Sequence, residues 1–332
     1  KKVTNAEDVW KQGYGDGVQL TWLFLGLARA AGFEAYGVWT SDRRNYFFNP
    51  TEMNPQKLDA NVVLVKLNGK DIYCDPGALF TPMGLLPWTE TGVQGLRLDK
   101  DGGSWITTFL PQSDESGIER TANLKLSDDG DVEGTLKVTF SGLEALRRRV
   151  EERHADQAAR KTFLEDEVKE VIPAAAEVEL TNQPAWETSE RTLTAEFHLK
   201  IPGWAAGAGR RELVPVGMFT APEKHLFEHA NRVHPIYIEF PFQRVDDVTI
   251  ELPQGWQVGT VPKAENEGGK VLGYSLQADS NKTTLHLKRS MHVNMLLMEQ
   301  KYYASLRSFF QVVRIADEQQ VVLQPETANA SK

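Results

Sequence analysis

Cysteine and long apolar runs are both scarce in this chain of 332 residues. The single cysteine, Cys74, excludes an intrachain disulfide and a cysteine-rich metal motif. The longest apolar run near the start, LTWLFLGLA, is too short to cross a bilayer and is followed by Arg29. We therefore expect no transmembrane segment in this chain.

Positive charge is also in short supply. The chain has 37 Lys and Arg against 46 Asp and Glu, which gives a net charge of -9. An acidic chain is poorly suited to a phosphate backbone, so we expect no nucleic-acid partner. The one basic cluster, Arg147 to Arg149, is interleaved with glutamates and predicts a solvated, ion-paired helix face.

The first hundred residues alternate between helical and extended patterns. Residues 18–31 carry apolar residues at helical spacing, and Gly32 follows at the position where a helix ends. A strand is expected at 34–40, a polar loop at 41–58 and a hairpin around Asn68-Gly69 at 61–76. Arg43 and Arg44 in the loop could contact an acidic ligand, although solvated loop charges are the default interpretation.

The remaining residues favour β structure. A hairpin at 118–140, one long helix at 142–172 and strands at 176–181 and 190–201 are expected, and further β segments recur up to a terminal helical segment at 303–313. The fold class predicted is α+β, with three domains: an α/β domain at 1–110, a β-sheet with one long helix at 111–208, and a β-sandwich at 209–332.

The order of elements in residues 12–76 resembles the transglutaminase-like (papain-like) core. The resemblance is to bacterial proteins in which such a core is followed by an uncharacterised all-β region. There the helix starts with Gly-Tyr-Gly-Asp-Cys, one strand reads Asn-His-Val and the next ends in Asp-Pro. Here the matching stretches are GYGDG (13–17), ANV (60–62) and CDP (74–76). The resemblance implies a catalytic triad whose positions are Gly17, Asn61 and Asp75.

Only Asp75 of that triad is retained, because the nucleophile position is Gly17 and the base position is Asn61. A three-residue hairpin loop with Gly69 in the left-handed region would pair Lys66 with Lys70 and place Asn61 opposite Asp75. A two-residue turn would instead place Val62 opposite Asp75. We favour the first register, in which Asn61 could hydrogen-bond Asp75.

Covalent catalysis is not expected from these residues. Cys74 adjoins Asp75 on a strand, points to the opposite face and is interpreted as a core residue. Asp16 is expected to cap the helix, and Asp16, Trp22 and Trp39 are candidate residues lining a cleft, with core packing as the alternative for the tryptophans. Loss of both nucleophile and base predicts a catalytically inactive domain.

A histidine cluster offers the one candidate metal site. His225 and His229 have a spacing that could share a helix face, and His234 follows. The pattern His-Glu-x-x-His is missing, so an ordinary helix surface leading into a strand is favoured. No metal or cofactor is expected.

The leading functional hypothesis is a non-catalytic binding or scaffold protein for a peptide, protein or glycan. One alternative is a hydrolase with a non-cysteine or metal-dependent site. Another is a structural part of a longer exported protein whose N-terminal region is absent here. Proteins with this resemblance are often exported, which favours the periplasm or the cell surface.

Overall fold

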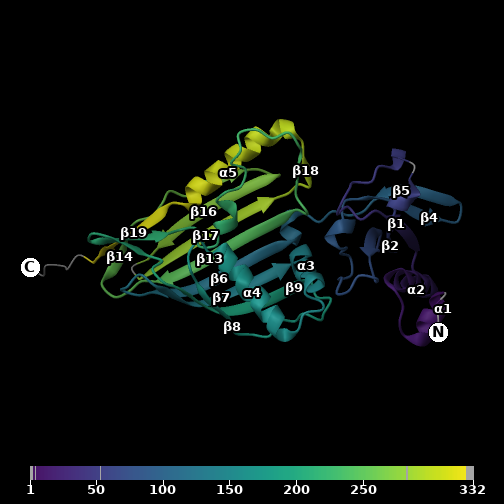
Figure 1. The fold of residues 1–332 in the computed structure, drawn as a ribbon, viewed down its shortest axis with the longest axis horizontal. Coiled ribbons are helices and arrows are strands. Elements are labelled where there is room, and N and C mark those ends of the chain that lie inside the picture. Colours follow the sequence, from purple (N-terminus) through teal and green to yellow (C-terminus); the bar gives the residue numbers. More distant parts are fainter. Residues whose placement is uncertain (1–2, 4, 53, 282, 327–332) are drawn as a thin grey trace, which may run out of the picture. The chain divides into compact units, whose positions relative to one another are not determined.

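The computed structural model describes residues 3, 5–52, 54–281 and 283–326, which form two compact units. Unit 1 comprises residues 1–112, 141–153 and 186–192, and unit 2 comprises 113–140, 154–185 and 193–332. Strands dominate the described chain and the helices are few (Figure 1). The β-rich α+β class expected from the sequence is therefore observed.

Unit 1 contains a five-stranded antiparallel sheet with the strand order β3-β2-β1-β4-β5. Its strands are β1 (Ala35–Thr40), β2 (Ala60–Leu67), β3 (Lys70–Cys74), β4 (Gln94–Asp99) and β5 (Gly102–Thr107). Its helices are α1 (Ala6–Gln12), α2 (Gly17–Ala30) and α3 (Leu143–Glu151).

Helix α2 covers one face of this sheet. Leu25 and Ala28 pack against Ala35, Val63 and Val65, which alternate along β1 and β2 as a half-buried sheet requires. The opposite face buries a second apolar cluster. The start of α2 is thereby fixed at the end of the sheet where β1 and β3 finish.

Local capping signals set the ends of α2, as the sequence predicts. The Asp16 side chain accepts a hydrogen bond from the Gln19 N–H at 2.8 Å, and the Gln19 side chain accepts one from the Asp16 N–H at 3.0 Å. This reciprocal pair is a capping box. At the other end Gly32 adopts a φ of 89°, which favours glycine.

Unit 2 is built on an eight-stranded sheet with the order β15-β16-β17-β13-β6-β7-β9-β8. The central pair, β13 and β6, is parallel, and residues 126 positions apart lie beside each other there. The strands are β6 (Gly117–Leu126), β7 (Val132–Ser141), β8 (Glu177–Leu180), β9 (Thr192–Ile201), β13 (Phe242–Glu251), β15 (Glu265–Gly268), β16 (Leu272–Ser280) and β17 (Thr284–Val293).

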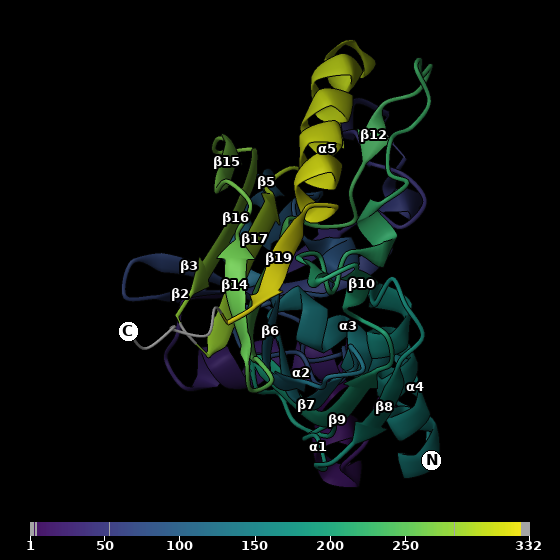
Figure 2. The same cartoon turned by 90° about the vertical axis from the view of Figure 1, so that its left-hand side faces the viewer.

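Two smaller sheets and two helices complete unit 2. Figure 2 shows β14 and β19 side by side, as their antiparallel pairing requires. The four-stranded sheet has the order β10-β11-β19-β14, with β10 (Ala206–Ala208), β11 (Arg211–Pro215), β14 (Trp256–Thr260) and β19 (Gln320–Pro325). The other elements are the pair β12 (Ile236–Tyr237) and β18 (Leu297–Met298) and the helices α4 (Gln157–Val171) and α5 (Tyr303–Asp317).

The eight-stranded sheet takes strands from both of the β-rich domains expected at 111–208 and 209–332. The expected boundary near residue 110 lies close to residue 112, where the first segment of unit 1 ends. The division of the chain into three domains, each able to fold independently, stays a prediction.

The single helix expected at 142–172 is wrong, because the chain forms α3 and α4 with a break between them. Asp156 is the N-cap residue of α4, because its side chain accepts a hydrogen bond from the Ala159 N–H at 2.8 Å. The solvated helix face expected around Arg147–Arg149 is also wrong. Arg149 is 1% exposed and donates to the carbonyls of Glu190 and Thr192, both at 2.6 Å.

Helix α5 lies along the large sheet (Figure 1), and buried charges attach it there. Asp317, the last residue of α5, accepts two hydrogen bonds from Arg289 of β17 at 2.8 and 2.9 Å, and one from the Tyr274 hydroxyl of β16 at 2.7 Å. Farther along the same layer, Arg120 of β6 pairs with Asp246 of β13 at 2.9 Å. A carboxylate at a helix C-terminus interacts unfavourably with the helix dipole. The ion pair with Arg289 compensates for this and accounts for Asp317 at the end of α5.

Among the described residues, none of the helices combines the length and the apolar character needed to cross a membrane.

Candidate functional site

The start of α2 lies directly against the turn that follows β3. A Cβ atom added to Gly77 would stand 2.5 Å from the Gly17 carbonyl oxygen, so the two backbones are in contact. A Cβ at Gly17 itself would stand 3.3 Å from the Gly77 oxygen. The fold therefore brings Gly17 close to Asp75, two residues before Gly77.

The Asp75 carboxylate is occupied by its own turn. Its Oδ1 atom accepts hydrogen bonds from the N–H groups of Gly77 at 2.9 Å and Ala78 at 3.2 Å. Burial is the largest influence on this carboxyl and raises its pKa, while the hydrogen bonds from Gly77 and Ala78 lower it. Asp75 thus stabilises the turn that contacts the start of α2.

The hairpin register that we favoured from the sequence is wrong. Asn68 and Gly69 have φ angles of 51° and 76°, and Leu67 pairs with Lys70 across a two-residue turn. Both central residues with positive φ are what a type I′ turn requires. The last ladder pair is Val63 with Cys74, so counting back places Val62 opposite Asp75.

Asn61 consequently does not face Asp75. Its partner across the ladder is Trp39 of β1, and within the described residues its side chain makes no hydrogen bond to Asp75. The alternation along β2 puts Asn61 on the face that carries Val63 and α2. The structure brings Gly17 and Asp75 together and places Asn61 in β2, and among the described residues the Asn61 side chain makes no hydrogen bond to either.

Glu90 is the partner of Asp75, and no sequence pattern pointed to it. It ends a short 3-10 helix (Trp88–Glu90) and its side chain is buried. Burial, followed by the charge of Asp75, raises the pKa of Glu90 well above its ordinary value, and the Glu90 Oε2 atom is buried without a hydrogen-bond partner among the described residues. A buried carboxyl beside a second carboxyl favours its neutral form.

The other side chains expected around the helix start lie in different environments. Trp22 packs its ring over Gly37, where a Cβ would stand 2.6 Å from the ring, so Trp22 belongs to the core beneath α2. Trp39 is 40% exposed. Cys74 is buried, and burial is the main reason that the pKa of its thiol is raised, so the thiolate is disfavoured.

The histidine cluster is not on a helix. His225 lies in the turn that follows the 3-10 helix Ala221–Glu223, and Phe227 adopts a φ of 57° between His225 and His229, which is incompatible with a helix through both histidines. His225 instead pairs with Glu228 at 2.8 Å on the surface. Across the described residues, no group of three or more His, Cys, Asp or Glu side chains is placed to hold a metal ion.

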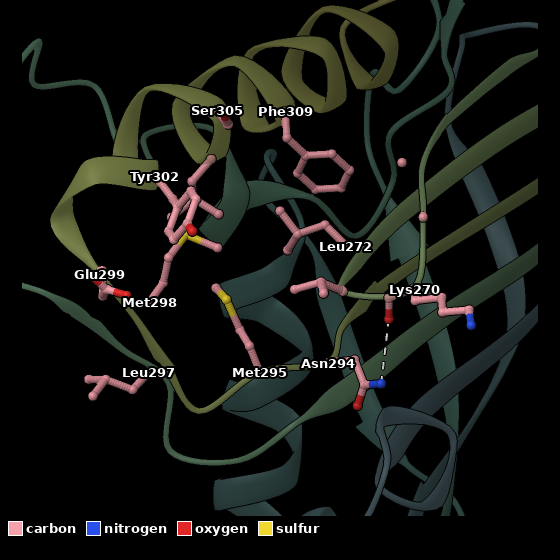
Figure 3. Close-up of a pocket in the computed structure, with 14 residues that line it drawn as sticks. Lys270, Leu272, Asn294, Met295, Leu297, Met298, Glu299, Tyr302, Ser305 and Phe309 are labelled. Atoms are coloured by element: carbon pink, nitrogen blue, oxygen red, sulfur yellow. Dashed lines mark hydrogen bonds between the residues drawn. The ribbon is translucent and has the colours of Figure 1, made fainter.

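Unit 2 contains an open, largely apolar groove that sequence reasoning did not identify. It has a volume of about 670 Å³ and lies between the start of α5, the β15–β16 turn and the segment that follows β17. Figure 3 shows Met295, Met298, Tyr302 and Phe309 around one space. No periodic pattern marks it, because its residues come from three separate segments.

The base of the groove is held by Asn294. Its N–H donates to the Val271 carbonyl at 2.7 Å, and its side-chain amide donates to the Lys270 carbonyl at 3.4 Å (Figure 3). Its side-chain oxygen accepts a hydrogen bond from the Ser113 N–H. These contacts fix the β15–β16 turn to the segment after β17, so the groove is largely preformed.

Exposed apolar side chains surround this groove. Leu297 is 55% exposed, Tyr302 51% and Val271 48%. Contiguous exposed apolar surface of this kind marks interaction sites on soluble proteins. The groove has no nucleophile paired with a base among its described lining residues, and it is suited to binding rather than catalysis.

Comparison with known proteins supports the fold. Residues 211–323, which include the whole groove, match a family described as "Domain of Unknown Function with solved-structure structure (DUF3858)". The crystal structure of a "putative protease" from Parabacteroides distasonis is similar to 97% of the chain with a TM-score of 0.53 and 11% identity. The chain spans 46% of that protein's length. No curated protein matches the chain.

Proposed function

We propose that the chain is a non-catalytic, transglutaminase-like binding protein, and that the groove in unit 2 holds the apolar side chains of a peptide. The groove carries this proposal, because its volume lies within the range of ligand sites and its lining is largely apolar. Methionine side chains adapt to varied partners, which suits a site that accepts peptide sequences of more than one kind.

The resemblance of unit 1 to a transglutaminase-like core supports the non-catalytic part of the proposal. The start of α2 lies against the turn after Asp75, as a triad of that kind would need, yet Gly17 and Asn61 supply neither a nucleophile nor a base. The Asp75 carboxylate accepts hydrogen bonds from the backbone of its own turn. An exported location in the bacterial envelope belongs to this proposal and rests on the resemblance.

A peptide is favoured over a glycan by the chemistry of the lining. Sugars are held by flat aromatic faces together with many polar hydrogen-bond partners, whereas this groove presents Met295, Met298 and Leu297 beside two aromatic rings. An extended peptide would place two or three apolar side chains in the space and leave its backbone at the open side.

The test is selection of binders from a random peptide library displayed on phage, with the full chain immobilised. We expect the recovered peptides to be enriched in Leu, Met, Phe and Trp, and to lose at least tenfold in affinity for Leu297→Glu, because a charge would be placed in the apolar lining. Ile315→Glu is the matched control, since Ile315 is a 62% exposed residue of α5 that does not line the groove.

The proposal would be contradicted if the peptides bound Leu297→Glu with the same affinity as the original chain. It would also be contradicted if no peptide were recovered. Catalysis is tested separately with an amine-incorporation assay on casein and an amide-hydrolysis assay. We expect no turnover in either. Activity that disappears in Asp75→Ala would show that unit 1 is an enzyme. The peptide-binding part of the proposal would still be decided by the library selection alone.

A further inference from the structure

A small basic pocket lies in unit 2, between helix α5 and the segment of residues 224–228, and has a volume of about 90 Å³. The α5 side is lined by residues at three- and four-residue spacing, which share one face of a helix. These residues are Arg307, Phe310, Gln311 and Arg314. The groove described above is lined by other residues of α5, so the two sites are separate.

The segment of residues 224–228 is attached to α5 by aromatic contacts. The centroid of the Phe227 ring lies 5.0 Å from that of Phe310 and 6.2 Å from that of Tyr303. The Tyr303 hydroxyl donates to the His229 carbonyl at 2.7 Å. These contacts maintain the positive φ of Phe227, which is uncommon for a residue other than glycine. The two sides of the basic pocket are therefore held together by the fold.

Positive charge in the basic pocket exceeds negative charge. The cationic side chains of the lining are those of Lys224, Arg307 and Arg314. Glu228 is the one carboxylate among the described lining residues, which leaves a balance of two positive charges. Within the described chain, the side chains of Lys224 and Arg307 form no ion pair or hydrogen bond. Glu228 lies 3.8 Å from Arg314 and is closer to His225, at 2.8 Å.

An unpaired donor in the lining also favours a ligand. The Nε atom of Arg307 is buried and has no hydrogen-bond partner among the described residues. Buried donors without a partner are rare and unfavourable in proteins. The side-chain amide of Gln311 likewise forms no hydrogen bond within the described chain and adds a neutral donor. A ligand that accepts hydrogen bonds and carries negative charge would satisfy these groups.

We infer that the basic pocket binds a phosphate group, held by Lys224, Arg307 and Arg314. A phosphate monoester carries about 1.5 to 2 negative charges at pH 7, which matches the two positive charges left in the lining. Its oxygens point in several directions and can accept from both sides of the pocket, whereas a carboxylate has two oxygens in one plane. The volume is well below that of sites that enclose a whole ligand, so the remainder of a phosphate ester would extend into solvent.

The experiment is a chemical-shift titration of the full, isotope-labelled chain with inorganic phosphate, methyl phosphate and acetate at constant ionic strength. We expect both phosphates to bind saturably with a dissociation constant of about 1 mM and to shift the amide signals of α5. Acetate should bind about fivefold more weakly or less, because it has a single charge and two oxygens. Tighter binding of methyl phosphate indicates a phosphate ester as the ligand, and equal or weaker binding indicates free phosphate.

Variants with opposite effects locate the site. Lys224→Gln and Arg314→Gln each remove a charged donor and are expected to weaken binding of inorganic phosphate about fivefold. Glu228→Gln removes the one carboxylate of the lining and is expected to strengthen binding about threefold, a gain that damage to the fold would not produce. Lys288→Gln is the matched control, since this exposed lysine of β17 lies outside the pocket and its loss changes the net charge equally.

Three results would overturn the inference. The first is no saturable binding of either phosphate, and the second is acetate that binds as tightly as inorganic phosphate. The third is an affinity for phosphate in both Lys224→Gln and Arg314→Gln that equals that of Lys288→Gln. Weaker binding by Glu228→Gln would also overturn it, because the carboxylate would then support the ligand and the ligand would not be an anion.

Discussion

Glu90 is a buried residue that contributes to the pH response of unit 1. Its pKa is raised by burial and by Asp75, and Asp42 and Asp59 add further negative charge nearby. The folded chain therefore holds a proton that the unfolded chain releases near pH 4.5. The stabilising effect is fully present below that pH, and it is lost as the pH rises through the higher folded pKa.

We predict that the free energy of unfolding decreases as the pH is raised above about 4.5, by about 1.4 kcal/mol for each unit by which the folded pKa exceeds the unfolded one. Glu90→Gln keeps the shape and stays neutral, so its stability should lose this pH dependence. Urea denaturation at a series of pH values measures it, with Glu7→Gln as an exposed control. An unchanged slope in Glu90→Gln would show that Glu90 is ionised in the fold.

At the residue scale, the sequence predicted structure correctly where the interacting residues are close together in the chain. Asp16 caps α2 and Gly32 follows it, because both effects depend on residues within one turn. The register at Asn68-Gly69 was wrong, since the same dipeptide fits two loop lengths and the local sequence does not choose between them. Glu90 could not be predicted, because its burial beside Asp75 depends on the tertiary fold.

At the scale of elements, the charged face of α3 also shows that local sequence does not reveal interaction partners that are distant in the chain. A run of arginines and glutamates has the periodicity of a solvated helix, but the carbonyls that accept from Arg149 belong to a segment about forty residues away. The groove was missed for a similar reason, since it is formed by the ends of elements and not by any one of them.

The attachment of α5 to the large sheet gives a prediction at this scale. Asp317→Ala would leave Arg289 buried without its closest carboxylate, with Asp246 farther away at 3.6 Å. Breaking a buried pair in this way costs about 3–5 kcal/mol, so the midpoint of urea unfolding should fall markedly. Glu7→Ala, which removes an exposed pair with Lys11, should change stability far less.

A loss of less than about 1 kcal/mol in Asp317→Ala would mean that the arginine reaches water or another carboxylate. The same variant should also weaken peptide binding, because the start of α5 forms one side of the groove. That second measurement separates an effect on α5 from a general loss of stability.

At the scale of the whole molecule, the large sheet decides which parts of the chain fold alone. β13 pairs along its length with β6 on one side and β17 on the other. A fragment of residues 209–332 lacks β6 and would expose one edge of β13, and exposed edges promote aggregation. We predict that this fragment is insoluble or unfolded, while a fragment of residues 113–332 is soluble and cooperatively folded.

Circular dichroism and size-exclusion chromatography of the two fragments test this prediction, and the result also decides the three-domain division expected from the sequence. A monomeric, folded 209–332 fragment would favour that division. Sequence patterns identified most of these strands, but not their order, because nothing local specifies that β6 and β13 become neighbours.

The parallel pairing of β6 with β13 also means that β6 is synthesised well before its partner strand. Arg120 leaves the ribosome 126 residues before its partner Asp246, which at typical elongation rates is a delay of roughly 6 to 25 s. Throughout that interval the β6–β7 hairpin has an open edge and an arginine whose counter-charge has not yet been made. Nascent chains of this protein should therefore be frequent clients of ribosome-associated chaperones, and slower translation between residues 126 and 242 should lower the yield of folded protein.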